Sequence, residues 1–137
     1  MNRRDFLAKS SAPVVAVCAA CLGACSKSSS GSSAPANVNF NVDLGTQLTT
    51  VGASLVQSGV IVVRTASGNT TTSFTAVQVA CTHEGTAINW NNGSNRFICP
   101  NHGANFSATG AVLLGPATRN LKQYNIAITG NTLTVTG

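Results

Sequence analysis

Acidic residues are almost absent from this chain. Only 3 of its 137 residues are Asp or Glu, and charged residues of both signs make up 8% of the composition. This scarcity argues against chemistry by paired carboxylates. Aromatic residues are also few, at 5%, so the chain can build a modest hydrophobic core but not a large one. The length suits one small domain with appendages.

Basic runs with interleaved aromatic residues are also lacking, although the formal net charge is +5. Arg3, Arg4 and Lys9 lie near the N-terminus, and the other basic residues are scattered along the chain. The pattern that marks a nucleic-acid surface is therefore absent, and we expect no nucleic-acid partner.

The N-terminal apolar stretch, residues 12–24, is short for a membrane-spanning helix, which needs about 20 residues. With its basic start and small residues at its end, it predicts that residues 1–24 are an export signal. Residues 2–7 (NRRDFL) resemble the twin-arginine signal, which exports folded proteins, commonly around a cofactor. A general secretory signal is the alternative.

The residues after this stretch predict a membrane tether. Residues 22–25 (LGAC) resemble the cleavage box of bacterial lipoproteins, which implies that Cys25 is lipidated. An ordinary cleavage site and an uncleaved anchor are the alternatives. The Ser-rich composition of residues 25–37 predicts a flexible linker after this cysteine. We therefore expect an exported, periplasmic or cell-surface domain of residues 38–137, held to the membrane by a lipid anchor.

Short alternating runs of Val, Ile, Thr and Phe, separated by Gly and Asn, fill this domain. Residues 129–132 (TGNT) predict a tight hairpin. The predicted strands are residues 39–43, 47–50, 61–65, 73–80, 88–91, 96–99, 111–114, 124–129 and 132–136. Residues 51–58 allow a weak helical alternative. The predicted fold class is all-β, a small antiparallel sandwich or barrel.

Every cysteine and histidine of the predicted domain falls in two clusters, residues 81–85 (CTHEG) and 99–103 (CPNHG). Each cluster follows a predicted strand and ends at a glycine, so both are expected on loops that project from a sheet. The four candidate ligands are Cys81, His83, Cys99 and His102. They can hold a zinc ion or a two-iron, two-sulfide cluster. A disulfide between the cysteines is a third alternative, but it leaves the two histidines unexplained.

The two clusters resemble the paired cluster-binding boxes of Rieske [2Fe-2S] proteins. The order of later elements is similar too, with residues 106–110 (FSATG) followed by residues 115–117 (GPA), which resemble the proline loop that covers the cluster. The resemblance spans residues 73–137. It implies a small antiparallel Rieske-type sandwich or barrel with a cluster-binding subdomain of two loops.

The resemblance also assigns roles to single residues. It implies that Cys81 and Cys99 bind the inner iron and that His83 and His102 bind the outer iron near the surface. The implied environment of the cluster consists of Glu84, Gly85, Asn101, Gly103, Ala104, Phe106 and Pro116.

The chain departs from the Rieske proteins of quinol-oxidising complexes. Those carry an extra cysteine in each box, and the pair forms a disulfide; here Thr86 and Asn101 occupy these positions. They also usually have Ser and Tyr after the second box, where Ala104 and Phe106 stand here. Fewer donors to the cluster sulfurs imply a lower potential, although Asn101 can donate instead. Glu84 replaces the usual Leu, either as a solvated loop tip or as a charge that disfavours an added electron.

The resemblance implies one-electron transfer through a [2Fe-2S] cluster in an exported, membrane-tethered domain. Such a chain is an electron-transfer protein or an oxidoreductase subunit, not a stand-alone enzyme, and its redox partner is a cytochrome, a molybdoenzyme or a quinol-oxidising complex. One alternative is the Rieske small subunit of an arsenite-oxidase-like or cytochrome bc-type enzyme. The other is a zinc-stabilised binding module.

Overall fold

The structure is a computed structural model, and it describes residues 33–137. The predicted export signal, residues 1–24, and the predicted lipidation site, Cys25, lie outside the described residues. Within the described part of the chain, no helix is long and apolar enough to cross a membrane.

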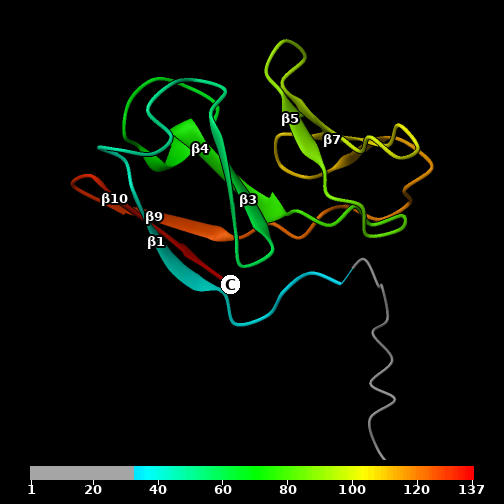
Figure 1. The fold of residues 1–137 in the computed structure, drawn as a ribbon, viewed down its shortest axis with the longest axis horizontal. Helices are drawn as coiled ribbons and strands as arrows, with labels where there is room; N and C mark the ends of the chain where they lie inside the picture. The colour runs from blue at the N-terminus through cyan, green and yellow to red at the C-terminus, as the bar shows by residue number, and fades with distance from the viewer. Residues whose placement is uncertain (1–32) are drawn as a thin grey trace, which may run out of the picture.

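The strands of the described chain are short and form three antiparallel sheets, which confirms the predicted all-β class (Figure 1). The first sheet has the order β1 (Asn39–Asp43), β10 (Thr132–Thr136), β9 (Asn125–Thr129). The second has the order β2 (Ser54–Gln57), β3 (Val60–Arg64), β4 (Phe74–Gln78). The third has the order β5 (Asn89–Asn91), β6 (Arg96–Ile98), β7 (Asn105–Ser107), β8 (Val112–Leu114). A short 3₁₀ helix, η1 (Thr71–Ser73), precedes β4.

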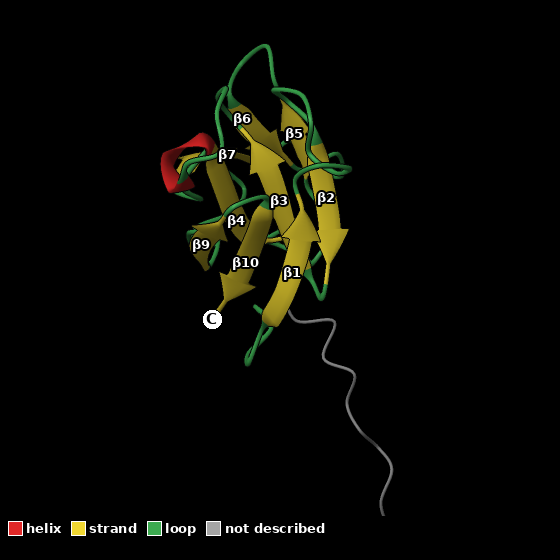
Figure 2. Cartoon of the chain, turned by 90° about the vertical axis from the view of Figure 1, so that its left-hand side faces the viewer, coloured by secondary structure: helices red, strands yellow, loops and turns green. Residues whose placement is uncertain are grey.

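The second sheet lies between two hydrophobic cores. Successive side chains of a strand point to opposite faces, and β3 uses both: Val60 and Val62 enter the first core, while Ile61 and Val63 enter the second. All four are at most 2% exposed. In two views at right angles, β3 lies between the first and third sheets (Figures 1 and 2).

The two cores differ in what they support. The first core contains Val38, Phe40, Val42, Leu44, Leu48, Val60, Val62, Phe74, Ala76, Tyr124, Leu133 and Val135. The second contains Ile61, Val63, Val77, Cys81, Ile88, Phe97, Cys99, Ala104, Phe106, Ala117 and Leu121. Both cysteines of the two predicted ligand loops therefore belong to the second core.

The strand predictions were accurate where apolar and polar residues alternate. Residues 39–43 and 132–136 match β1 and β10, and the two strands pair over their full length. The prediction for residues 47–50 was wrong: Gln47 closes a turn on the carbonyl of Asp43 at 2.8 Å. Leu48 then has a φ of 50° and buries its side chain in the first core.

Two strands were not predicted. The helical alternative for residues 51–58 was wrong, because β2 occupies part of this range and pairs with β3. β7 also escaped prediction because it has three residues, of which only Phe106 is apolar. Its pairing with β6 and β8 supplies the order that its own sequence does not signal.

Arg64 ends β3 as a buried cation, 6% exposed. Its guanidinium donates to the carbonyls of Leu48, at 2.5 Å, and Gly68, at 2.7 Å, and to the side chain of Asn69, at 2.8 Å. The same group lies 4.5 Å from the ring centroid of Phe74. Because each of its three nitrogens donates to a neutral acceptor, Arg64 ties two loops to the second sheet and has a structural role.

The segment before β1 lies against the domain. The carbonyl of Pro35 accepts hydrogen bonds from the hydroxyl of Tyr124, at 2.7 Å, and from Nζ of Lys122, at 3.4 Å. Val38 and Gly137 then exchange backbone hydrogen bonds of 2.7 and 3.0 Å. Contacts with the domain thus begin within the range that the sequence predicted to be linker.

Replacing Tyr124 by Phe is expected to lower the free energy of unfolding by about 1 kcal/mol. The substitution keeps the ring, which is part of the first core, and removes the hydroxyl that holds the Pro35 carbonyl. Urea denaturation of the two chains measures the difference. Equal unfolding free energies would show that water hydrates this carbonyl as well as the phenol does.

Candidate metal centre

The two predicted ligand loops share one backbone design. In each loop the cysteine carbonyl accepts a hydrogen bond from the glycine amide four residues later, at 2.8 Å from Gly85 to Cys81 and at 3.0 Å from Gly103 to Cys99. The two glycines have φ values of 79° and 77°, which a residue with a Cβ adopts only with strain. Each cysteine amide in turn donates, at 2.8 Å, to the carbonyl five residues later. The glycines that close both sequence motifs are thus required by these turns.

The cysteines form the buried side of the site. Cys81 is 0% exposed and Cys99 is 2% exposed, and both are free thiols. Burial raises the pKa of the Cys81 thiol above its ordinary value; a backbone hydrogen bond from His83 lowers this pKa in part, and the neighbouring Cys99 raises it again. The raised pKa favours the protonated thiol. A metal cation favours the thiolate instead, because it binds this form and displaces the proton.

The histidines form the exposed side. The ring centroids of His83 and His102 lie 5.0 Å apart, with the ring planes at 82°. Each comes from a different loop, so the fold brings together two imidazoles that lie in separate sequence motifs. One ligand atom each of His83, Glu84 and His102 can be chosen so that all three lie within 4.8 Å of one another.

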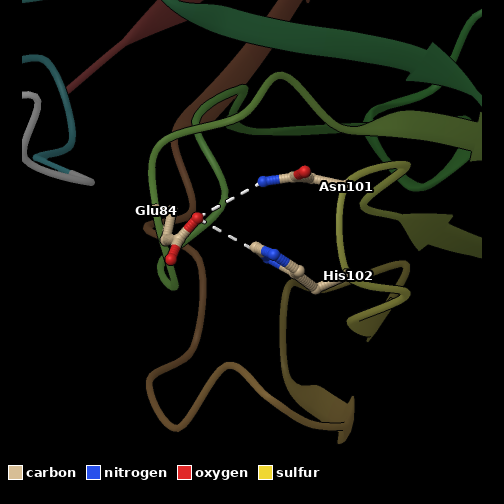
Figure 3. A network of polar contacts seen from close by, with 3 residues as sticks. All are labelled: Glu84, Asn101 and His102. Carbon is tan, nitrogen blue, oxygen red and sulfur yellow. Dashed lines mark hydrogen bonds and ion pairs between the residues drawn. The ribbon is translucent and has the colours of Figure 1, made fainter.

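Glu84 contacts the opposite loop twice (Figure 3). Its Oε2 accepts a hydrogen bond from Nδ2 of Asn101 at 3.3 Å, and the same oxygen lies 3.6 Å from Nδ1 of His102. The side chains of His102 and Glu84 are 43% and 55% exposed. The amide of Asn101, which the sequence analysis offered as a donor to sulfur, is directed in this structure to a carboxylate.

A third segment, residues 115–121, packs beside the loops. The hydroxyl of Thr82 donates to the carbonyl of Arg119 at 2.5 Å, and Thr82 itself is buried. Ala117 is 3% exposed and belongs to the second core, whereas Pro116 lies at the surface. This segment therefore contacts the first loop through the carbonyl of Arg119, and a role of Pro116 in covering the cluster stays a prediction.

Ala104 and Phe106, which follow the second loop, are both 0% exposed. Neither side chain carries a hydroxyl, so the two positions for which the resemblance implied donors to sulfur in quinol-oxidising proteins are apolar here. They contribute packing to the second core in place of polar contacts.

The four candidate ligands suit a metal centre with an apolar inner side. Two thiols lie inside the second core and two imidazoles lie at the surface above it. This donor set is compatible with tetrahedral zinc and with a [2Fe-2S] cluster that has two Cys and two His ligands. The geometry thus fits both groups, and comparison with known proteins distinguishes them.

A family model for the Rieske [2Fe-2S] domain matches residues 37–125. The chain belongs to the Rieske [2Fe-2S] domain family. Its cofactor is therefore a [2Fe-2S] cluster. This assignment excludes a zinc ion and a disulfide between the two cysteines as alternatives for the site. The match begins two residues before β1 and ends at the first residue of β9, so it covers both ligand loops.

Known proteins support this assignment. The Rieske domain is 40% identical to the cytochrome b6-f complex iron-sulfur subunit of Chlorobaculum thiosulfatiphilum over 63 residues, which are 46% of this chain and 35% of that protein. The cyanobacterial plasma membrane Rieske protein PetC3 from Synechocystis PCC 6803 is 35% identical, with a TM-score of 0.57, over 73% of this chain and 99% of that one.

A more distant structure shares the fold alone. The ferredoxin of carbazole 1,9a-dioxygenase from Nocardioides aromaticivorans IC177 is 23% identical, with a TM-score of 0.55, over 76% of this chain and 98% of that one. The match to the curated cytochrome b6-f subunits, by contrast, spans only about a third of their length.

The structure brings the four predicted ligands together with Glu84 and Asn101 and adds contacts that the sequence did not reveal. Sequence reasoning missed the link of Glu84 to Asn101 and the bond from Thr82 to Arg119. Both join residues far apart in the sequence. No spacing rule marks such pairs, because they depend on how the loops are placed relative to one another.

Proposed function

We propose that this Rieske domain is a one-electron carrier in which Cys81 and Cys99 bind one iron and His83 and His102 bind the other. The observation that carries the proposal is the pair of imidazoles, with centroids 5.0 Å apart, above two buried cysteines. When bound, a [2Fe-2S] cluster accepts and releases a single electron.

The chain's own residues divide the work between the two sides of the site. Phe106, Ala104 and Phe97 are 0% exposed and exclude water from the cysteine side. His83 and His102 lie at the surface, which shortens the path for an electron to a partner protein. No side chain is required to transform a substrate, so we propose a carrier or an oxidoreductase subunit, not a stand-alone enzyme.

A second candidate is a subunit of a quinol-oxidising complex. It is favoured by the 40% identity to a protein named as the iron-sulfur subunit of a cytochrome b6-f complex. Against it stand the apolar Ala104 and Phe106 and the carboxylate of Glu84, which favour a lower potential than quinol oxidation uses. A cytochrome or a molybdoenzyme remains the alternative partner.

The N-terminal residues add a proposal about location. Residues 2–7 resemble a twin-arginine signal and Cys25 lies in a lipoprotein box, so we propose export and lipid anchoring. An anchored domain has a raised local concentration near membrane-bound partners.

An EPR-monitored redox titration of the purified chain tests the proposed function. We expect a Rieske-type signal in the reduced protein, with a midpoint in the lower part of the family range of about −150 to +300 mV. A midpoint near the top of that range would favour the quinol-oxidising subunit. A chain that shows no signal at any potential and contains zinc would contradict electron transfer.

A further inference from the structure

We propose that Glu84 and Asn101 form a latch between the two ligand loops that holds a carboxylate beside the imidazole pair and lowers the reduction potential. The latch consists of Glu84, Asn101 and His102. The proposal rests on the proposed roles of His83 and His102 as ligands, and it adds two positioning residues to them.

The contacts of a single oxygen support the latch. Oε2 of Glu84 accepts from Nδ2 of Asn101 at 3.3 Å and lies 3.6 Å from Nδ1 of His102 (Figure 3). Asn101 and His102 are neighbours on the second loop, whereas Glu84 is on the first. The carboxylate therefore links the loops at the same place where the two imidazoles meet.

Asn101 matters because the contact with His102 alone does not fix the exposed side chain of Glu84. The Glu84 side chain is 55% exposed, and even a full ion pair at such a position does little to hold a long side chain in one rotamer. The Asn101 amide adds a directional hydrogen bond to the same oxygen. We infer that this bond keeps the negative charge near the outer side of the site instead of in solvent.

The position of the charge determines its effect on the cluster. Reduction adds one negative charge to the cofactor, and a fixed carboxylate nearby makes that addition less favourable. A ligand atom of each histidine lies within 4.8 Å of a Glu84 oxygen. At this distance solvent screening is incomplete, so the latch should shift the balance between oxidised and reduced protein.

Three single variants separate the charge from the hydrogen bond. Glu84→Gln keeps an oxygen acceptor for Asn101 and removes the charge. Asn101→Ala keeps the charge and removes the bond that holds it. Asp43→Asn is the matched control, because Asp43 is the other carboxylate side chain of the described residues, lies on β1, and accepts a bond from the amide of Gly45 at 2.8 Å.

The readout is the midpoint potential of the full chain, measured by EPR-monitored titration. For Glu84→Gln we expect a tenfold higher ratio of reduced to oxidised protein at fixed potential, which is about 59 mV for one electron. For Asn101→Ala we expect a rise of about two- to threefold in that ratio. When Asn101→Ala is combined with Glu84→Gln, the midpoint potential should equal that of Glu84→Gln alone, because no charge is left for Asn101 to hold.

Two results would overturn the latch. One is a Glu84→Gln midpoint that moves no more than that of Asp43→Asn. The other is an Asn101→Ala midpoint equal to that of the unaltered chain. In either case the unaltered chain still shows its Rieske-type signal, so the proposed function stands. Absence of the signal from the unaltered chain itself would instead remove the proposed function and the latch together.

A second measurement needs no cofactor. The two loops are followed by hydrogen exchange at the amides of Gly85 and Gly103, in protein prepared without the cluster. Each amide closes its loop by a hydrogen bond, so its exchange reports opening of that loop. Asn101→Ala should accelerate this exchange and Asp43→Asn should not. Identical exchange in all three chains would show that the contact does not hold the loops together.

Discussion

Replacement of Cys99 by Ser is expected to abolish the Rieske-type EPR signal and to leave the purified chain without bound iron. A serine hydroxyl stays protonated at neutral pH and is a poor substitute for a thiolate, which is the form that binds iron. Cys99 is 2% exposed in the second core, so no solvent-borne ligand can take its place. Iron analysis and EPR of the reduced protein measure the loss.

The chain contains a matched control for this change. Cys25→Ser makes the same substitution at a cysteine outside the two ligand loops, and it should leave the signal intact. A Cys99→Ser protein that keeps its full signal would exclude Cys99 as a ligand. Loss of the signal in both variants would instead point to an effect of cysteine number on production of the protein.

Truncation of Phe106 to Ala is expected to cost about 3–5 kcal/mol of unfolding free energy. Phe106 is 0% exposed and lies in the second core together with both cysteines. A domain of this kind has a total stability of about 5–15 kcal/mol, so the expected loss is a large fraction of the whole. Chemical denaturation of the chain gives the difference.

Phe106→Leu is the companion variant, because it keeps an apolar side chain of more similar volume. Its loss should be less than half that of Phe106→Ala. If the two variants lose equally little, the surrounding side chains collapse into the space and the second core is less rigid than the structure indicates. Phe106→Ala should also weaken iron retention, since the cavity admits water beside the cysteines.

Much of the fold could be predicted because several strands have a clear period of two. β1 alternates exposed and buried residues, β10 alternates exposed or half-buried residues with buried ones, and both were predicted with their observed ends. β2 could not be predicted with equal clarity, because it is an edge strand with exposed and half-buried residues. Residues 47–50 resemble a strand in composition, but a turn at Gln47 and the positive φ of Leu48 override that local preference.

The candidate site was predictable in its residue types and not in its contacts. Spacing alone drew attention to Cys81, His83, Cys99 and His102, since these are all the cysteines and histidines of the predicted domain. The partner of Glu84 could not be predicted, because Asn101 lies 17 positions later in the sequence. Only the approach of the two loops determines that these side chains meet.

Because β3 contributes side chains to both cores, it determines how the domain unfolds. Val60 and Val62 belong to one core while Ile61 and Val63 belong to the other, so this stretch has no face on which a polar side chain is tolerated. Neither core can lose this strand without exposing apolar surface in its neighbour. The sheet beneath the ligand loops is therefore lost only in an opening that also disrupts the sheet of β1, β9 and β10, whereas the loops themselves can open locally.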